Sequence, residues 1–199
     1  MHTENWSFRQ DTLAYLRTHQ LMMDAFNPGW GAAAVGVHSF DLRPLGNGEV
    51  AVRLAQDRQE ATTWRTHLVR AHWLPYNNAG TTVCQIDDTA DYFFTVDLSG
   101  CRVTVTPGPY RYIGTNYPTV RHIGGGMTLA NRNAATNAAV ALVPLPQQAR
   151  ARSISQASGI TYNVEGFVVG FKTALGVWKF YIQDDNPAGG GRRVRQFYP

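Results

Sequence analysis

Short segments in which hydrophobic and polar residues alternate recur along most of the chain, and they predict a core built mainly of β-strands. The clearest pair flanks Cys101: residues 92–95 are aromatic and β-branched, and residues 102–106 alternate between valine and polar side chains. Alternation of this kind places one face of a strand in a core. The same pattern predicts further strands at residues 32–42, 50–54, 67–75, 83–86, 119–123, 160–173 and 177–182. A Gly-Asn-Gly sequence at residues 46–48 predicts a hairpin turn between the first two of these.

Two other segments have the character of helices. Ser7 and Gln10 have the spacing of a capping box, and the apolar residues after them predict a helix over residues 7–25, ended by an Asn-Pro-Gly sequence. Residues 128–143 are rich in Ala and Asn and predict a second helix, which Pro144 would end. We therefore expect a β-rich core with two helices, in the mixed α+β class.

Length and composition favour a single domain over residues 1–199. The chain has 199 residues, 44% of them apolar, and it contains no internal repeat and no interdomain linker. Its net charge of +4 suits contact with an acidic partner surface but is too small to indicate direct binding of nucleic acid. No apolar run approaches the ~20 residues of a membrane span, so we expect no insertion into a membrane.

Cysteine usage and the N-terminal residues bear on where the protein works. Cys84 and Cys101 are too few for a disulfide framework in a domain of this size, so we expect two reduced thiols. The first residues lack the basic and then apolar order of a signal peptide. If the protein is exported, we expect a route that does not read such a signal.

A bend between the two central strands carries the most reactive candidate side chain. Gly100 permits a backbone conformation there that other residues avoid, and Cys101 follows it directly. Twenty-one residues later, His122 lies in another predicted strand. A Cys and a His on a rigid β scaffold are the minimum for catalysis by a thiolate nucleophile. Backbone N–H groups at the bend are natural donors to an oxyanion.

Each of these residues also has a simpler explanation when it is taken alone. A free Cys beside a strand is usually inert core, and a single His is more often structural than catalytic. The other histidines lack the spacing of a metal site, so we predict neither a metal nor a cofactor. The triple glycine at residues 124–126 lacks the lysine of a phosphate-binding loop.

Two loops have compositions that suggest a role. Residues 107–118, rich in Pro, Gly and Tyr, join the strand after Cys101 to the strand of His122 and form a candidate wall of a substrate cleft. Residues 186–195 predict a flexible basic loop near the end of the chain.

The order of four motifs favours the catalytic interpretation. They are Trp-Leu-Pro at residues 73–75, Phe-Phe-Thr at residues 93–95, Leu-Ser-Gly-Cys at residues 98–101, and His122. This set resembles the bacterial glutamine-deamidase toxins of the Burkholderia lethal factor type and, more distantly, the catalytic domain of the cytotoxic necrotizing factors. The resemblance covers roughly the last two-thirds of the chain. The spacing from Cys to His is longer here, because the loop at residues 107–118 is inserted, and this leaves the target protein open.

The resemblance implies a fold and a set of roles. The fold would be a β-sandwich-like core of mixed sheets flanked by helices, as in the necrotizing factor catalytic domain. Cys101 would be the nucleophile, His122 the base and acid, and Thr95 the residue that orients the His. Ser99 and Gly100 would belong to the backbone that binds the oxyanion.

The resemblance also implies an activity. The protein would be a toxin or effector that converts a specific Gln of a host protein to Glu through a thioester, without a cofactor. It would be secreted or injected without a conventional signal peptide and would act in the host cytoplasm; we expect a monomer. The targets known for the family are a translation-initiation RNA helicase and Rho-type GTPases, and the sequence does not select between them.

Two alternatives remain open at this point. The same thiol chemistry would serve a Cys-His transglutaminase or a cysteine protease. In a non-enzymatic alternative, the protein is a β-rich binding module whose basic tail docks on an acidic surface through Arg192, Arg193 and Arg195. In that case Cys101 would not react with thiol probes at neutral pH.

Overall fold

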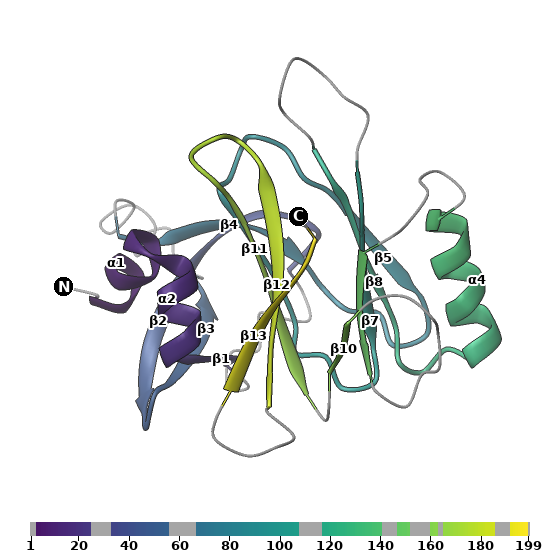
Figure 1. Cartoon of the computed structure of the whole chain (residues 1–199), viewed down its shortest axis with the longest axis horizontal. Helices are drawn as coiled ribbons and strands as arrows, with labels where there is room; N and C mark the ends of the chain where they lie inside the picture. Colours follow the sequence, from purple (N-terminus) through teal and green to yellow (C-terminus); the bar gives the residue numbers. More distant parts are fainter. Residues whose placement is uncertain are drawn as a thin grey trace.

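Two β-sheets and three helices make up the part of the chain that the computed structural model describes, namely residues 3–24, 33–55, 67–107, 117–140, 147–151, 160–162, 165–185 and 192–198. The helices are α1 (Thr3–Gln10), α2 (Thr12–Thr18) and α4 (Leu129–Val140). The larger sheet has eight strands, in the order β1 (Gln20–Met23), β3 (Glu49–Leu54), β2 (Gly36–Gly46), β4 (Val69–Leu74), β6 (Tyr92–Thr95), β11 (Gly166–Lys172), β12 (Trp178–Asp185) and β13 (Arg192–Tyr198). The smaller sheet has five strands, in the order β10 (Ile160–Tyr162), β9 (Gln147–Ala151), β7 (Arg102–Thr106), β8 (Thr119–Ile123) and β5 (Thr81–Gln85). A mainly β structure with a few helices agrees with the α+β class expected from the sequence (Figure 1).

The larger sheet is mixed, and it curls around α2. β1 pairs in parallel with β3, and β4 with β6, whereas its other strand pairs are antiparallel. Gln183 of β12 accepts a hydrogen bond from the backbone N–H of Leu21 (2.7 Å) and donates one to the carbonyl oxygen of Leu16 (2.6 Å). β12 lies near one end of the sheet and β1 at the other, so these bonds draw the two ends together.

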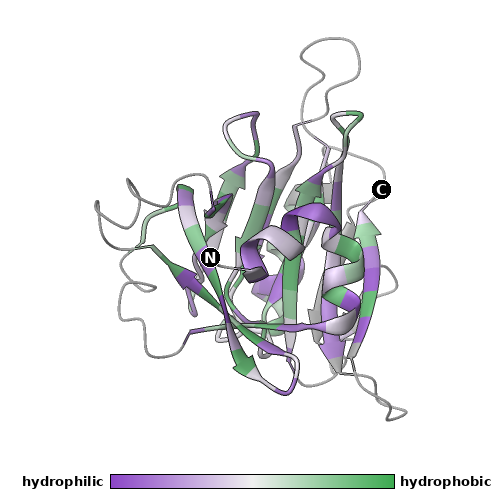
Figure 2. Cartoon of the chain, turned by 90° about the vertical axis from the view of Figure 1, so that its left-hand side faces the viewer, coloured by the Kyte–Doolittle hydropathy of each residue, from purple (hydrophilic) through white to green (hydrophobic). Residues whose placement is uncertain are grey.

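Two hydrophobic cores lie on opposite faces of the larger sheet. One fills the space between the sheets, and the other lies between the larger sheet and the helices α1 and α2. β6 contributes to both because its side chains alternate: Phe93 packs in the first core and Phe94 in the second. Figure 2 shows α1 and α2 in front of the larger sheet, with hydrophobic and hydrophilic residues alternating along its strands. Thr95 follows the alternation and faces the smaller sheet.

The smaller sheet has α4 on its outer face (Figure 1). Arg102, at the start of β7, is fully buried and donates hydrogen bonds to the side chains of Thr136 and Asn133 on that helix. Alternation along β7 therefore points Arg102 toward α4 and its neighbours Cys101 and Val103 toward the core between the sheets. The long buried side chain fixes α4 against the strand that carries the candidate nucleophile.

The prediction of one helix over residues 7–25 is wrong. Two short helices take its place, and residues 20–23 form β1. Asp11 interrupts the helix because its side chain accepts a hydrogen bond from the backbone N–H of Ala14 (2.9 Å) and caps α2. Pairing with β3 then makes the following residues extended. The predicted Asn-Pro-Gly end of the helix lies outside the described residues.

The prediction of a flexible basic loop over residues 186–195 is also wrong where it can be checked, because residues 192–198 form β13. Arg193 and Arg195 both bond to the fully buried carboxylate of Asp184, at 2.7 and 2.8 Å. Two of the three arginines proposed to dock an acidic surface are therefore bound within the fold.

The single strand predicted over residues 160–173 is wrong, because β10 and β11 are separate strands that belong to different sheets. The remaining strand predictions agree with the structure in existence and type. β2 and β3 form the predicted hairpin, and its turn residues Asn47 and Gly48 both have positive φ, at 53° and 78°. This is the backbone geometry that a two-residue hairpin turn requires. The predicted second helix is present as α4, and its predicted end at Pro144 lies outside the described residues. Most of the predicted cleft wall at residues 107–118 lies outside the described residues.

Candidate active site

Cys101 follows a sharp backbone bend and precedes β7 directly. Gly100 has a φ of +86°, in the left-handed region that favours glycine, as the sequence predicted. Ser99 is exposed, whereas Cys101 is only 4% exposed. The thiol thus lies just below the surface, on the side of β7 that faces the larger sheet.

His122 lies on β8, next to β7, and its side chain faces the same side. In the antiparallel register Val103 pairs with His122. Side chains two residues apart on a strand share a face, so Cys101 and His122 are diagonal neighbours across the strand pair. Such positions have β-carbons ~7 Å apart, a separation that an imidazole can bridge.

Thr95 connects His122 to the larger sheet. Its Oγ1 lies 2.9 Å from Nδ1 of His122 and donates a hydrogen bond to the carbonyl oxygen of Leu74 (2.8 Å). A hydroxyl has a single proton, and here Leu74 accepts it, so Thr95 must accept from Nδ1–H. This assigns the tautomer of the imidazole: Nδ1 carries the proton and Nε2 carries the lone pair. The imidazole therefore presents a basic nitrogen at Nε2.

The environment of His122 keeps the imidazole neutral. Burial lowers its pKa from 6.5 to about 4. Nε2 is buried and has no hydrogen-bond partner among the described residues. The hydrogen bond expected between Nε2 and the sulfur of Cys101 is therefore not formed in this structure. Catalytic hydrogen bonds are often long without substrate and shorten when it binds.

Opposing effects act on the pKa of the Cys101 thiol. Burial raises its pKa, whereas backbone hydrogen bonds from Gly125 and Ser99 and the positive charge of Arg132 lower it. The direction that prevails is upward, so the thiol is protonated at neutral pH and needs a base to become a nucleophile. Nε2 of His122 is a candidate base on the same face of the smaller sheet.

Two side chains that the sequence analysis did not single out hold the backbone around Cys101. Arg132 on α4 donates from Nη1 to the carbonyl oxygen of Gly100 (2.9 Å), and Tyr162 on β10 donates from its hydroxyl to the carbonyl oxygen of Cys101 (2.7 Å). Arg132 is the only charged residue in α4, which is a sequence signal for a specific role. Tyr162, by contrast, stands in a short β segment with no motif around it.

The triple glycine packs against the bend instead of forming a ligand loop. A β-carbon on Gly125 would lie 3.2 Å from the carbonyl carbon of Gly100, and one on Gly124 only 2.1 Å from the carbonyl oxygen of Asn77. Gly126 accepts no side chain either, because Asn78 occupies that space. The glycines are needed for close approach of three backbone segments beside Cys101.

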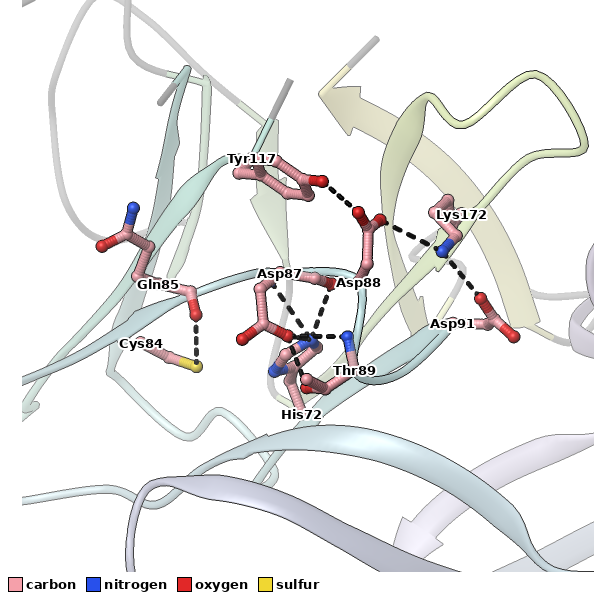
Figure 3. A network of polar contacts seen from close by, with 9 residues as sticks. All are labelled: His72, Cys84, Gln85, Asp87, Asp88, Thr89, Asp91, Tyr117 and Lys172. Atoms are coloured by element: carbon pink, nitrogen blue, oxygen red, sulfur yellow. Dashed lines mark hydrogen bonds and ion pairs between the residues drawn. The ribbon is translucent and has the colours of Figure 1, made fainter. Parts of the chain in front are cut away.

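The second buried cysteine, Cys84 on β5, is also a diagonal neighbour of His122, because Thr82 pairs with His122 and Cys84 with Val120 on the same face of the smaller sheet. Figure 3 shows the polar contacts of Cys84 and those of the second buried histidine, His72, drawn as separate groups. The thiol of Cys84 donates to the carbonyl oxygen of Gln85 (3.8 Å), and burial raises its pKa to about 12. Nε2 of His72 lies 3.2 Å from the carbonyl oxygen of Asp87. Lys172 extends the network by pairing with Asp88 and Asp91, at 3.4 and 2.9 Å (Figure 3). None of these polar contacts activates the thiol of Cys84.

Comparison of the sequence with protein families and with curated proteins does not assign it to a family. No protein-family model matches the sequence, and no curated protein gives a significant match. Among the described residues, no group of three His, Cys, Asp or Glu side chains could hold a metal ion, and no helix is long and apolar enough to span a membrane. The motifs and the geometry around Cys101 are therefore the features that bear on function.

Proposed function

We propose that this protein is a protein-glutamine deamidase that uses Cys101 as nucleophile and His122 as base and acid. The observation that carries the proposal is the hydrogen bond from Nδ1 of His122 to Thr95, whose own proton is bound by Leu74. This arrangement makes Nε2 the basic nitrogen, on the face of the smaller sheet that also carries Cys101. Orientation of the base by a third group is the general signature of an activated nucleophile.

The reaction would begin with transfer of the Cys101 proton to Nε2 of His122. The thiolate then attacks the carboxamide carbon of a substrate Gln, forming a C–S bond and an oxyanion. Backbone N–H groups at the bend, that of Cys101 among them, would stabilise that charge. Protonated His122 gives its proton to the departing nitrogen, the C–N bond breaks, and ammonia leaves a thioester on Cys101.

Hydrolysis of the thioester would complete the cycle. His122 takes a proton from water, the resulting hydroxide attacks the thioester carbon, and the C–S bond breaks. The proton returns to the sulfur, so the net change is Gln and water to Glu and ammonia. Burial keeps the imidazole of His122 neutral, as each of the two proton abstractions requires, and it also makes Nε2 a weaker base than an exposed histidine.

The biological setting follows from the motif resemblance. We propose a toxin or effector that is secreted or injected and acts as a monomer in the host cytoplasm, on a translation-initiation RNA helicase or a Rho-type GTPase. The finer fold, a sandwich as in the necrotizing factor catalytic domain, belongs to the same proposal. It is supported by the core that the two sheets share.

The test is to map Gln-to-Glu conversion by mass spectrometry in host extract treated with the wild type, Cys101→Ser or Cys84→Ser. We expect specific sites converted by the wild type and by Cys84→Ser, and none by Cys101→Ser. Adding a primary amine separates deamidation from transglutamination, because both would use the same thioester. Equal conversion by wild type and Cys101→Ser would refute the proposal.

A further inference from the structure

The peptide groups on both sides of Cys101 are held by side chains from two other elements. The guanidinium of Arg132 binds the carbonyl oxygen of Gly100, and the hydroxyl of Tyr162 binds the carbonyl oxygen of Cys101. Tyr162 is fully buried, and its hydroxyl is a short 2.7 Å from its acceptor. The peptide groups before and after the side chain of Cys101 are thus both fixed by hydrogen bonds.

The orientation of the first peptide group decides where the oxyanion donor points. In a trans peptide the carbonyl and the N–H of the next residue point in opposite directions, and no described peptide bond is cis. The carbonyl of Gly100 points toward Arg132 on α4, so the N–H of Cys101 points away from α4. The positive φ of Gly100 takes this peptide group out of regular strand geometry. The hydrogen bond from Arg132 to the carbonyl oxygen of Gly100 fixes its orientation instead.

The helix that carries Arg132 is itself immobilised against the sheet. Arg102, fully buried, donates to the carbonyl oxygen of Arg132 (3.4 Å) and to the side chain of Thr136 one turn later. Thr136 in turn donates to the same carbonyl oxygen (2.8 Å). Arg132 therefore extends from a rigid platform, which is what positioning of a catalytic group demands.

The charge of Arg132 has a second consequence. Among the described residues Arg132 pairs with no carboxylate, and its positive charge favours the thiolate form of Cys101. His122 cannot supply a positive charge at neutral pH, because burial keeps it unprotonated. A fixed cation behind the bend offsets part of the effect of burial on the thiol.

We propose that Arg132 and Tyr162 are positioning residues that clamp the backbone on both sides of Cys101. Arg132 orients the N–H of Cys101 toward the oxyanion, and its positive charge stabilises the thiolate. This inference rests on the proposed function, since it gives the two residues their role in the same thiol chemistry. It also predicts behaviour of Cys101 that can be measured without a substrate.

The first experiment measures alkylation of Cys101 by iodoacetamide as a function of pH, in a Cys84→Ser background so that one thiol reports. We expect Arg132→Met to move the midpoint of the profile upward by about one pH unit. Arg132→Lys should restore most of the shift, because Lys keeps the charge and can make a single hydrogen bond. Arg17→Met, on the exposed face of α2, removes the same charge elsewhere and should leave the profile unchanged.

The second experiment tests the clamp itself through Tyr162→Phe, which removes only the hydroxyl. We expect the alkylation midpoint to stay at the wild-type pH, while deamidation in host extract slows about 10- to 100-fold per folded molecule. Thermal unfolding gives the folded fraction of each variant. A structural role alone would lower the unfolding temperature and leave the rate per folded molecule intact.

The outcomes separate the two proposals. If Cys101 of the wild type is not alkylated at any pH at which the protein is folded, the proposed function fails, and the clamp fails with it. If the wild type reacts but Arg132→Met has the same profile and Tyr162→Phe the same rate, the clamp is wrong and the deamidase proposal stands. A shift with Arg132→Met that Arg132→Lys reverses supports the clamp.

Discussion

Two regions of the core between the sheets each hold a buried histidine, His122 in one and His72 in the other, and the two rings differ in which nitrogen is already bound. At His122 the hydroxyl of Thr95 accepts from Nδ1–H and leaves Nε2 basic. At His72 it is Nε2 that lies against the backbone of Asp87. The same side chain is therefore presented as a base in one region and as a structural link in the other.

The two thiols differ in a parallel way. Cys84 donates to the carbonyl oxygen of its own neighbour, and both burial and the charge of Asp87 raise its pKa. Cys101 is buried as well, but backbone hydrogen bonds and the cation of Arg132 oppose that effect. The pKa of both thiols is raised, but only at Cys101 do nearby N–H groups and a positive charge oppose the effect of burial.

Replacing the two thiols should produce the largest difference. We expect Cys101→Ser to reduce Gln deamidation on the order of 10³-fold or more, since loss of a nucleophile removes the covalent route. Cys84→Ser should keep the wild-type rate per folded molecule. Quantitative mass spectrometry of converted sites in host extract measures both rates. Comparable losses in the two variants would place the chemistry elsewhere.

Replacing the two histidines should give the next largest difference. In His122→Asn, the side-chain amide can still donate to Thr95 but offers no basic nitrogen, so we expect a loss of about 10²- to 10⁴-fold. In His72→Gln, the amide at the end of the side chain can still reach the backbone of Asp87, and the rate per folded molecule should remain. A near-wild-type rate in His122→Asn would remove the general base from the mechanism.

The contribution of Thr95 can be isolated by comparing Val with Ser at that position. Thr95→Val keeps the shape but leaves the Leu74 carbonyl and the Nδ1–H of His122 without a partner, at a cost of about 1–3 kcal/mol each. We expect a 10- to 100-fold lower deamidation rate, because the imidazole loses its fixed tautomer. Thr95→Ser retains the hydroxyl and should recover most of the activity. Equal rates in the two variants would show that the hydroxyl only stabilises the fold.

Some elements of the fold could be predicted from the sequence, and others could not. Strands on both sides of Cys101 were predictable because alternation along them is strong, and Gly100 could be assigned its bend because few residues tolerate positive φ. The helix expected over residues 7–25 failed because β1 depends on pairing with β3, nearly thirty residues away. Local periodicity carries no information about such a partner.

The residues of the candidate site differ in whether the sequence could identify them. Thr95 entered only through the motif order, and its contact with His122 spans two sheets, so no local pattern announces it. Arg132 and Tyr162 act through backbone carbonyls: the isolated charge in α4 singles out Arg132, but the sequence does not show which carbonyl either residue binds. The basic tail was misread because its arginines bind Asp184, a residue of the preceding strand whose burial cannot be seen in the sequence.

The smallest expected effect is a loss of stability at acid pH, and we expect His122 to cause part of it. The pKa of His122 is lowered from 6.5 to about 4 in the folded protein, so below pH 6.5 the unfolded chain binds a proton that the folded protein does not. Stability from this residue is thus complete above pH 6.5 and is lost as the pH falls toward 4. Between pH 7 and pH 5 the loss is about 2 kcal/mol.

Denaturant unfolding of the wild type and of His122→Asn at several pH values isolates this contribution. His72 also has a pKa lowered by burial, so the wild type and the variant share its contribution, and only the difference between their pH profiles reports His122. We expect the free energy of unfolding of His122→Asn to fall less steeply below pH 6.5 than that of the wild type. Parallel profiles would contradict the expected loss of stability, because they would mean that burial does not lower the pKa of His122.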